Sequence, residues 1–150
     1  MALLLDSSIL LHCLRHPSRM PQGESADDDF FLSIISADEL LRVIPRAASE
    51  HERTRRRAWV EAVLEHFPVL PIDRATTRMH ADILHSMEKK KIRLGLHESW
   101  IAATCITHGL TLITLHPEAF QKSPRPQNHS LPLISKHGSP RWKARNSPSS

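Results

Sequence analysis

The chain has 150 residues, of which 40% are hydrophobic, 24% are charged and two are cysteines. This length suits one domain with a real core, and no run approaches the roughly 18 apolar residues of a membrane helix. The opening MALLLDSS carries no basic segment and reaches an acid at Asp6, so a secretory signal peptide is not expected. Cys13 and Cys105 are too few for a disulfide framework and lack metal-site spacing. We therefore expect reduced core cysteines in a cytoplasmic protein with no membrane partner.

The basic charge, a net +4 with a pI of about 9.5, is unevenly spread. Residues 1–120 hold 14 Lys and Arg against 16 acids, whereas residues 121–150 hold six Lys and Arg and no acid. We expect residues 136–150 to be a disordered basic tail rich in Pro and Ser; a non-specific contact with RNA phosphate is the alternative. A second basic run, Glu52–Arg57 (ERTRRR), predicts a solvated helix face, again with a phosphate contact as the alternative.

Short apolar runs alternate along the chain with segments of helical character. Strands are predicted at 2–5, 31–35, 68–72 and 110–114, with a weaker one at 130–134. Helices are predicted at 8–15, 36–44, 50–66, 74–91 and 97–108, and a polar loop or frayed helix at about 17–29. This alternation predicts an α/β fold with a parallel sheet and helices on both faces. The continuously apolar run ALLL at 2–5 agrees with a strand buried on both sides.

Several polar side chains are expected at the carboxyl ends of these strands. Asp6 follows the first strand directly, Glu39 is placed in the first turn of the helix after the second, and Glu98 opens the helix before the fourth. Thr114 and His116 follow the fourth strand. Because ligands of open α/β sheets bind beyond the carboxyl ends of the strands, these groups are expected to share one edge of the sheet.

Each residue also has an alternative role that involves no ligand. Asp6 could cap the following helix, and Glu39 could be the capping-box partner of Ser36, the expected N-cap. Glu98 could simply interact with the helix dipole, and His116 could be a solvated loop histidine. Their joint placement is what favours a site.

Clustered carboxylates repel one another, so they stay ionised together only when a cation neutralises them. Mg²⁺ or Mn²⁺ is the expected ion, because these cations take a few oxygen ligands and keep several waters. Such a site suits hydrolysis of a phosphodiester bond.

Three segments, LLLDSS, SADELL and GLHESWIAATCITHGLTLIT, in this order and spacing, resemble the PIN-domain ribonucleases, above all the VapC-like toxins of prokaryotic toxin–antitoxin pairs. The likeness covers roughly residues 2–135. It implies a three-layer α/β/α domain at residues 1–135 with a central parallel sheet of four to five strands. It also implies metal-dependent cleavage of single-stranded RNA, a homodimer, and a cognate antitoxin protein.

The resemblance assigns Asp6, Glu39 and Glu98 as catalytic and metal-binding residues. His116 is a fourth candidate metal ligand, and Thr114 is a candidate for orienting a ligand or water. Two of four acidic positions match the family pattern. Glu98 stands where the family usually has Asp, and His116 where it has Asp or Asn.

A further family acid just before Phe120 is replaced here by Ala119, with Glu118 one position early. Lengthening Asp to Glu adds a C–C bond of about 1.5 Å, whereas metal sites tolerate displacements of only about 0.5 Å. The alternative function is therefore a PIN domain that has lost its chemistry and binds RNA or a protein partner. A neutral imidazole at position 116 suits Mn²⁺ better than Mg²⁺, so greater activity in Mn²⁺ is expected.

Overall fold

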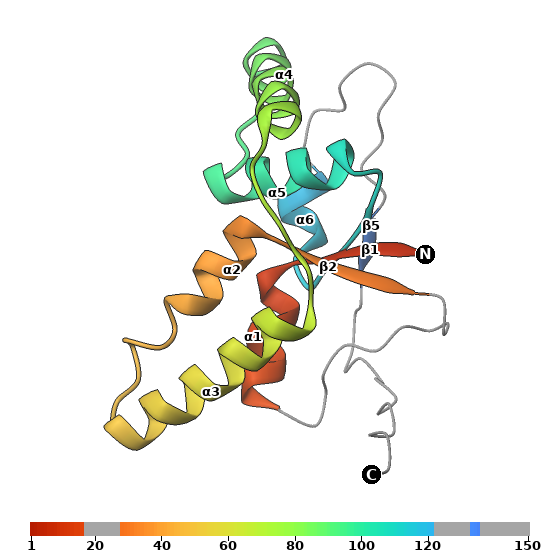
Figure 1. The fold of residues 1–150 in the computed structure, drawn as a ribbon. Helices are drawn as coiled ribbons and strands as arrows, with labels where there is room; N and C mark the ends of the chain where they lie inside the picture. Colours follow the sequence, from red (N-terminus) through yellow and green to blue (C-terminus); the bar gives the residue numbers. More distant parts are fainter. Residues whose placement is uncertain (17–27, 122–132, 136–150) are drawn as a thin grey trace.

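The computed structural model describes residues 1–16 and 28–121, and the backbone of residues 133–135. Its centre is a parallel sheet of five strands in the order β3-β2-β1-β4-β5 (Figure 1). The strands are β1 (Ala2–Leu5), β2 (Asp29–Ser33), β3 (Val69–Leu70), β4 (Thr111–Thr114) and β5 (Leu133–Ser135). The parallel sheet predicted from the sequence is confirmed.

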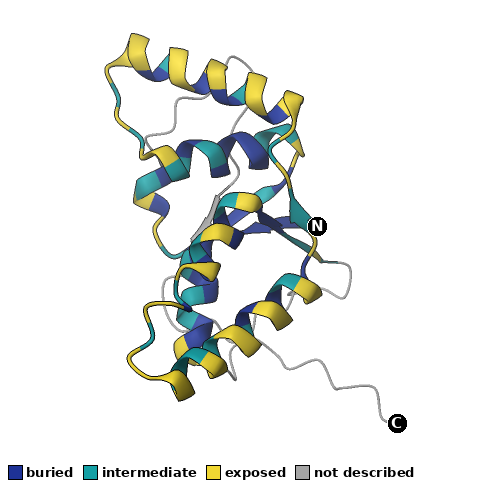
Figure 2. Ribbon diagram, turned by 60° about the vertical axis from the view of Figure 1, so that its left-hand side comes forward, coloured by how far each residue is buried: buried dark blue, intermediate teal, exposed yellow. Residues whose placement is uncertain are grey.

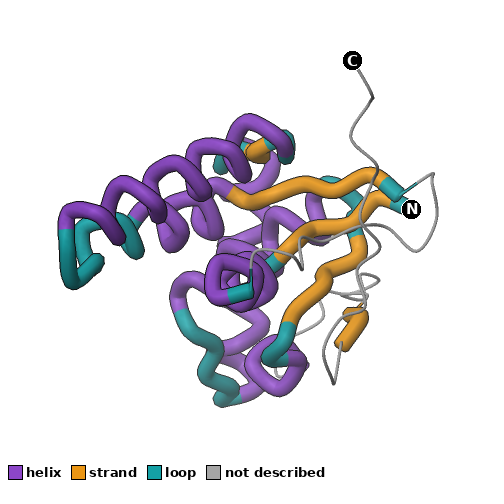
Figure 3. Tube along the Cα trace, turned by 90° about the horizontal axis from the view of Figure 1, so that it is seen from below, coloured by secondary structure: helices purple, strands orange, loops and turns teal. Residues whose placement is uncertain are grey.

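Helices cover the sheet on both faces, and this confirms the three-layer α/β/α architecture. They are α1 (Ser7–Arg15), α2 (Ile34–Leu41), α3 (Glu50–His66), α4 (Arg74–Lys90), α5 (Leu96–Thr107) and α6 (Pro117–Gln121). In Figure 1, α1 and α3 lie on one side of the sheet and α4 and α5 on the other. Figure 3 shows the strands running side by side with the helices packed along them.

The alternation of side chains along β1 divides the core between the two faces. Leu3 and Leu5 pack in one cluster with residues of α1, α2 and α3, whereas Leu4 packs in a second cluster with Ile101 of α5 and Phe120 of α6. Helix α4 is a further layer against α5, and its outer face is exposed (Figure 2). A strand buried on both faces explains why β1 is continuously apolar.

Two expectations for the second strand and its helix were wrong. The strand spans Asp29–Ser33, two residues earlier than predicted, so residue 29 is not part of a loop. The N-cap of α2 is Ser33, whose side chain accepts from the amide of Ser36, so the expected capping box of Ser36 and Glu39 does not form. Glu39 consequently lies beyond the first turn of α2, and its carboxylate is not used as a cap.

Other helix ends follow the sequence signals. Asp73 caps α4 by accepting from the Thr76 amide at 2.8 Å, as predicted. Gly109, just past α5, has a φ of 62°, a backbone conformation that glycine adopts without strain. The short helix α6 was not expected from the sequence. Strand β5 begins three residues later than predicted, and residues 130–132 lie outside the described part of the chain.

The predicted basic tail at 136–150 also lies outside the described residues. The run Glu52–Arg57 is largely paired within α3: Arg55 and Arg56 both donate to Glu52. Arg56 also donates to the carbonyl of Val43 at 2.8 Å. These bonds favour the expectation of a charged helix face. In the described part of the chain, no helix has the length and apolar character needed to cross a membrane.

Candidate active site

The strand order reverses between β1 and β4, which are neighbours in the sheet. The two strands are far apart in the sequence, since 105 residues lie between Leu5, the last residue of β1, and Thr111, the first residue of β4. Leu5 pairs with Ile113, and the amide of Asp6 donates to the carbonyl of Ile113 at 2.9 Å. Asp6 and Thr114 therefore leave the carboxyl ends of two adjacent strands at the switch point of the sheet. This is where an α/β sheet of this kind forms a crevice for a ligand.

Asp6 is buried, with 6% of its surface exposed, and is held by two hydroxyl groups. Ser8 Oγ and Thr114 Oγ1 each donate to Asp6 Oδ2 at 2.7 Å. Burial raises the pKa of Asp6 above its ordinary value, these two hydrogen bonds oppose the shift, and the charge of Glu39 adds to it. Asp6 occupies the N-cap position of α1, but its side chain makes no capping bond. The capping alternative for this side chain is therefore wrong.

Glu39 reaches the same region from α2. Its Oε1 lies 2.6 Å from Nδ1 of His97 on α5, and its Oε2 accepts from the hydroxyl of Ser7 on α1. Three helices therefore meet at this one carboxylate.

Glu98 lies in the first turn of α5, where its carboxylate folds back over the N-cap residue, Gly95. A Cβ added to Gly95 would stand only 1.9 Å from Glu98 Oε2. The absence of a side chain at position 95 therefore makes room for the longer acid. Glu98 also lies in the first turn of α5, where the helix dipole stabilises a carboxylate. An interaction with the dipole and a role in the pocket are therefore compatible for this side chain.

Thr114 and His116, which follow one another closely at the end of β4, differ in burial and in hydrogen bonding. Thr114 is fully buried; its Oγ1 donates to Asp6 and accepts from the His116 amide at 3.0 Å. The His116 imidazole is 64% exposed, with Nδ1 3.3 Å from a carboxylate oxygen of Glu118. Thr114 is thus part of the buried hydrogen-bond network, whereas His116 lies at the rim.

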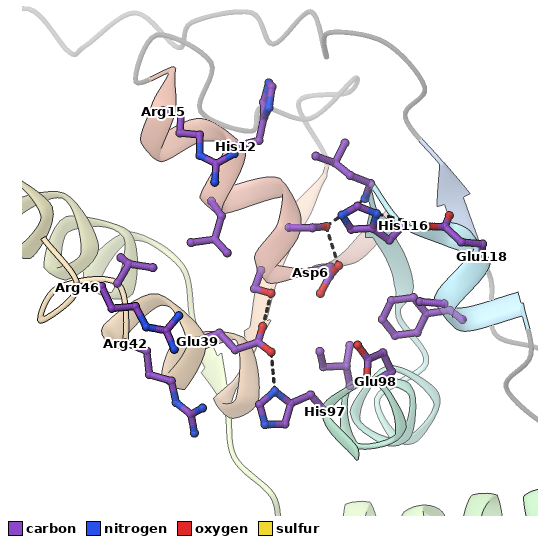
Figure 4. Close-up of a pocket in the computed structure, with 18 residues that line it drawn as sticks. Asp6, His12, Arg15, Glu39, Arg42, Arg46, His97, Glu98, His116 and Glu118 are labelled. Carbon is purple, nitrogen blue, oxygen red and sulfur yellow. Dashed lines mark hydrogen bonds and ion pairs between the residues drawn. The ribbon is translucent and has the colours of Figure 1, made fainter. Parts of the chain in front are cut away.

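The three acids and His116 line one pocket of about 660 Å³, whereas Thr114 is connected to it through its hydrogen bond to Asp6 (Figure 4). Asp6, Glu39, Glu98 and His116 all line it, as the sequence predicted, although their roles remain predictions. The sequence reasoning missed His97 and three arginines that line the same pocket, Arg15, Arg42 and Arg46. A signal exists for Arg42 alone, which follows Glu39 by three residues and caps the C-terminal end of α2, whereas Arg46 lies in the turn after the helix.

The donor set fits a hard divalent cation. A buried carboxylate whose pKa is raised by desolvation and by a neighbouring acid gains from a positive ion, and all three acids offer oxygen ligands. Within the described residues, no three His, Cys, Asp or Glu side chains are grouped closely enough to hold one ion together. Mg²⁺ is commonly bound through one or two carboxylates, with waters and substrate phosphate completing the shell, so a Mg²⁺ site does not require three grouped side chains.

The family is decided by comparison with known proteins. The PIN-domain family model matches residues 3–122. The chain belongs to the PIN-domain family. This PIN domain is 33% identical over 122 residues to Ribonuclease VapC1 of Rickettsia felis, covering 81% of this chain and 90% of the relative. It is 28% identical over 111 residues to Ribonuclease VapC4 of Mycobacterium tuberculosis, covering 74% and 83%.

Solved structures agree with the fold of this PIN domain. VapBC2 from Rickettsia felis, bound to a DNA fragment from its promoter, superposes with a TM-score of 0.75 at 16% identity, covering 91% of this chain and 100% of that one. VapBC-5 from Mycobacterium tuberculosis, a member of the VapBC family of toxin–antitoxin systems, has a TM-score of 0.60 at 26% identity, covering 75% and 83%. The resemblance found in the sequence is thereby confirmed.

Proposed function

We propose that this PIN domain is a divalent-metal-dependent endoribonuclease that cleaves single-stranded RNA, and that it is the toxin of a toxin–antitoxin pair. The observation that carries the proposal is Asp6, buried at the switch point of the sheet and oriented by Ser8 and Thr114. Glu39 and Glu98 line the same pocket. The relatives named Ribonuclease VapC support the activity.

The acids would hold Mg²⁺ or Mn²⁺ and position the attacking water. When bound, such an ion offsets the charge on the phosphate and makes water a better nucleophile. Asp6 holds its place through Thr114 and Ser8, Glu39 through His97 and Ser7. Asp6 follows the end of β1, Glu39 lies on α2 and Glu98 lies in the first turn of α5, so the three carboxylates reach one pocket from three different elements. His116 is a further candidate ligand at the rim.

The arginines of the pocket supply the contacts that an RNA backbone needs. Arg15, Arg42 and Arg46 are exposed and line the wall formed by α1 and the turn that follows α2 (Figure 4). Arg42 Nε donates to Asp38 at 2.9 Å, but that pair is about half exposed and contributes little to stability. Its remaining guanidinium donors suit phosphate oxygens on either side of the scissile bond.

The proposed protein partners are a cognate antitoxin and a second copy of the chain. Two of the structures similar to this chain are VapBC2 of Rickettsia felis and VapBC-5 of Mycobacterium tuberculosis, the latter described as a member of the VapBC family of toxin–antitoxin systems. Production of the wild-type chain in a bacterial host is expected to arrest growth. Asp6→Asn is expected to relieve the arrest, because it removes the central acid with little change in shape.

Cleavage of a mixed-sequence single-stranded RNA in Mn²⁺ tests the activity directly. We expect cleavage by the wild-type protein, none with EDTA, and none by Asp6→Asn. Folded, antitoxin-free protein that binds Mn²⁺ without cutting RNA would instead support the alternative, a binding module. The observation that favours this second candidate is that no three ligands are grouped around one point among the described side chains.

A further inference from the structure

The Glu39 carboxylate is held between two other helices. His97 Nδ1 on α5 is 2.6 Å from Oε1, and Ser7 Oγ on α1 donates to Oε2 (Figure 4). Because a carboxylate only accepts hydrogen bonds, His97 carries its proton on Nδ1 and donates it. Each carboxylate oxygen therefore has its own donor, and the plane of the group is fixed from two sides.

His97 belongs to a part of α5 that is itself anchored. Ser99 Oγ donates to the carbonyl of Leu96 at 2.7 Å and lies 2.8 Å from His80 Nε2 on α4. Since the Ser99 proton goes to Leu96, the His80 ring donates to Ser99. The His80 ring also stacks on Trp100, with ring centroids 3.5 Å apart and planes 5° from parallel. These contacts fasten the first turn of α5 to α4.

We propose that His97 is a positioning residue for Glu39. The anchored first turn of α5 then positions two acids: it contains Glu98, and through the His97 hydrogen bond it orients Glu39. The inference rests on the proposed metal-dependent function. Glu39 needs such a partner because its side chain has three rotatable bonds and is only partly buried, at 25% exposed. A freely rotating carboxylate loses rotamer entropy whenever it takes one position. A hydrogen bond that fixes the carboxylate before the metal binds lowers this entropic cost of binding. Hydrogen-bond partners of metal ligands commonly orient them in this way.

The test compares two substitutions at position 97 with a histidine outside the pocket. His97→Asn keeps a donor at the place of Nδ1, whereas His97→Leu keeps the bulk and removes the donor. His85 on α4 is exposed and does not line the pocket, so His85→Leu is the matched control. Mn²⁺ affinity is measured by titration calorimetry, and kcat and KM are measured on single-stranded RNA at saturating Mn²⁺.

We expect His97→Leu to weaken Mn²⁺ binding by roughly 10- to 100-fold, with His97→Asn within a few-fold of the wild-type protein and His85→Leu unchanged. At saturating Mn²⁺, kcat should fall in His97→Leu while KM for RNA stays constant, because His97 acts on Glu39 and not on RNA. In a Glu39→Gln background, His97→Leu should have no further effect on Mn²⁺ affinity. A purely structural role for His97 would instead lower affinity in both backgrounds.

Equal Mn²⁺ affinity in His97→Leu and the wild-type protein would overturn the inference, as would an equal defect in His97→Asn and His97→Leu. Failure of the proposed function looks different. A wild-type protein that binds Mn²⁺ but cuts no RNA rejects the nuclease, while the same calorimetric series still decides the role of His97. Absence of Mn²⁺ binding by the wild-type protein would overturn both.

Discussion

Thr114 Oγ1 donates a hydrogen bond to Asp6 Oδ2 at 2.7 Å, although the two residues are 108 positions apart. The bond joins the ends of β1 and β4 and orients the most buried acid of the pocket. The same hydroxyl accepts from the His116 amide, so one side chain organises both the acid and the turn after β4.

Thr114→Val removes this hydroxyl and keeps the shape of the side chain. We expect the free energy of unfolding to fall by about 1–2 kcal/mol, because Asp6 loses a donor and the His116 amide loses its acceptor. Mn²⁺ affinity should fall by roughly 10- to 100-fold. Chemical denaturation and titration calorimetry measure the two effects.

Thr107→Val is the control for that substitution. Thr107 Oγ1 is buried and finds no hydrogen-bond partner among the described residues. Its removal should leave Mn²⁺ affinity unchanged and should not lower stability, because an unsatisfied buried hydroxyl is itself unfavourable. Equal losses in the two valine variants would contradict a specific role for Thr114.

Asp6→Asn should not destabilise the protein at neutral pH in the presence of EDTA. Burial raises the pKa of Asp6 above 3.8 in the folded state, so the folded chain binds this proton more tightly than the unfolded chain does. The stability that this provides is fully present below pH 3.8 and is lost as pH rises through the folded-state pKa. The asparagine variant, which never ionises, should therefore be as stable as or more stable than the wild-type protein at pH 7.

The difference in the free energy of unfolding between these two proteins should shrink as pH falls toward 3.8. Denaturant titrations at a series of pH values measure it. The prediction is contradicted if the free energy of unfolding of the wild-type protein rises relative to that of Asp6→Asn as pH increases. That result would mean that the folded state favours the ionised form of Asp6.

Gly95→Ala should displace the Glu98 carboxylate, because the new Cβ would stand 1.9 Å from Oε2. We expect Mn²⁺ affinity to fall by about fivefold, or ~1 kcal/mol. The same change in a Glu98→Asp background should cost less, since the aspartate carboxylate is withdrawn by about 1.5 Å. The loss of an N-cap glycine is common to both backgrounds and cancels in the comparison. Equal effects of Gly95→Ala in both would show that position 95 does not constrain the acid.

RNA cleavage should be faster in Mn²⁺ than in Mg²⁺ at matched concentrations if His116 reaches the ion, because imidazole is a poor ligand for Mg²⁺. The imidazole is 64% exposed, so His116→Ala should fold normally. It should lower the ratio of Mn²⁺ to Mg²⁺ activity. An unchanged ratio would place His116 outside the metal site.

The two cysteines should resist alkylation in the native protein. Burial raises the pKa of Cys105 to about 12, and both thiols are buried. Thiolate is the reactive form, so labelling with iodoacetamide at pH 8 should proceed only after denaturation. Labelling of Cys105 in the folded protein, detected by mass spectrometry, would contradict its burial.

Much of the fold follows from local patterns. The run at residues 2–5 is apolar throughout because β1 is buried on both faces, and Asp73 marks the start of α4 because its side chain caps the helix locally. The start of α2 was placed too late because Ser33 and Ser36 are both suitable caps. Strand pairing ends β2 at Ser33, because residues 29–32 pair with β1 and Ser33 pairs with Leu70 of β3, and Ser33 then caps α2. The five residues of α6 are too few to give a periodic signal.

The sequence alone placed Asp6, Glu39 and Glu98 at one edge of the sheet, because parallel strands bring their carboxyl ends to the same side, and the structure has all three lining one pocket there. How the acids are held was decided by tertiary structure. His97 reaches Glu39 across 58 positions, and Gly95 makes room for Glu98 only because that side chain folds back. Such contacts depend on where helices from distant segments pack and on which rotamers they leave open. The strands, the helices and the parallel sheet follow from patterns in the sequence, whereas the strand order and the hydrogen bonds between side chains are set by how distant segments pack.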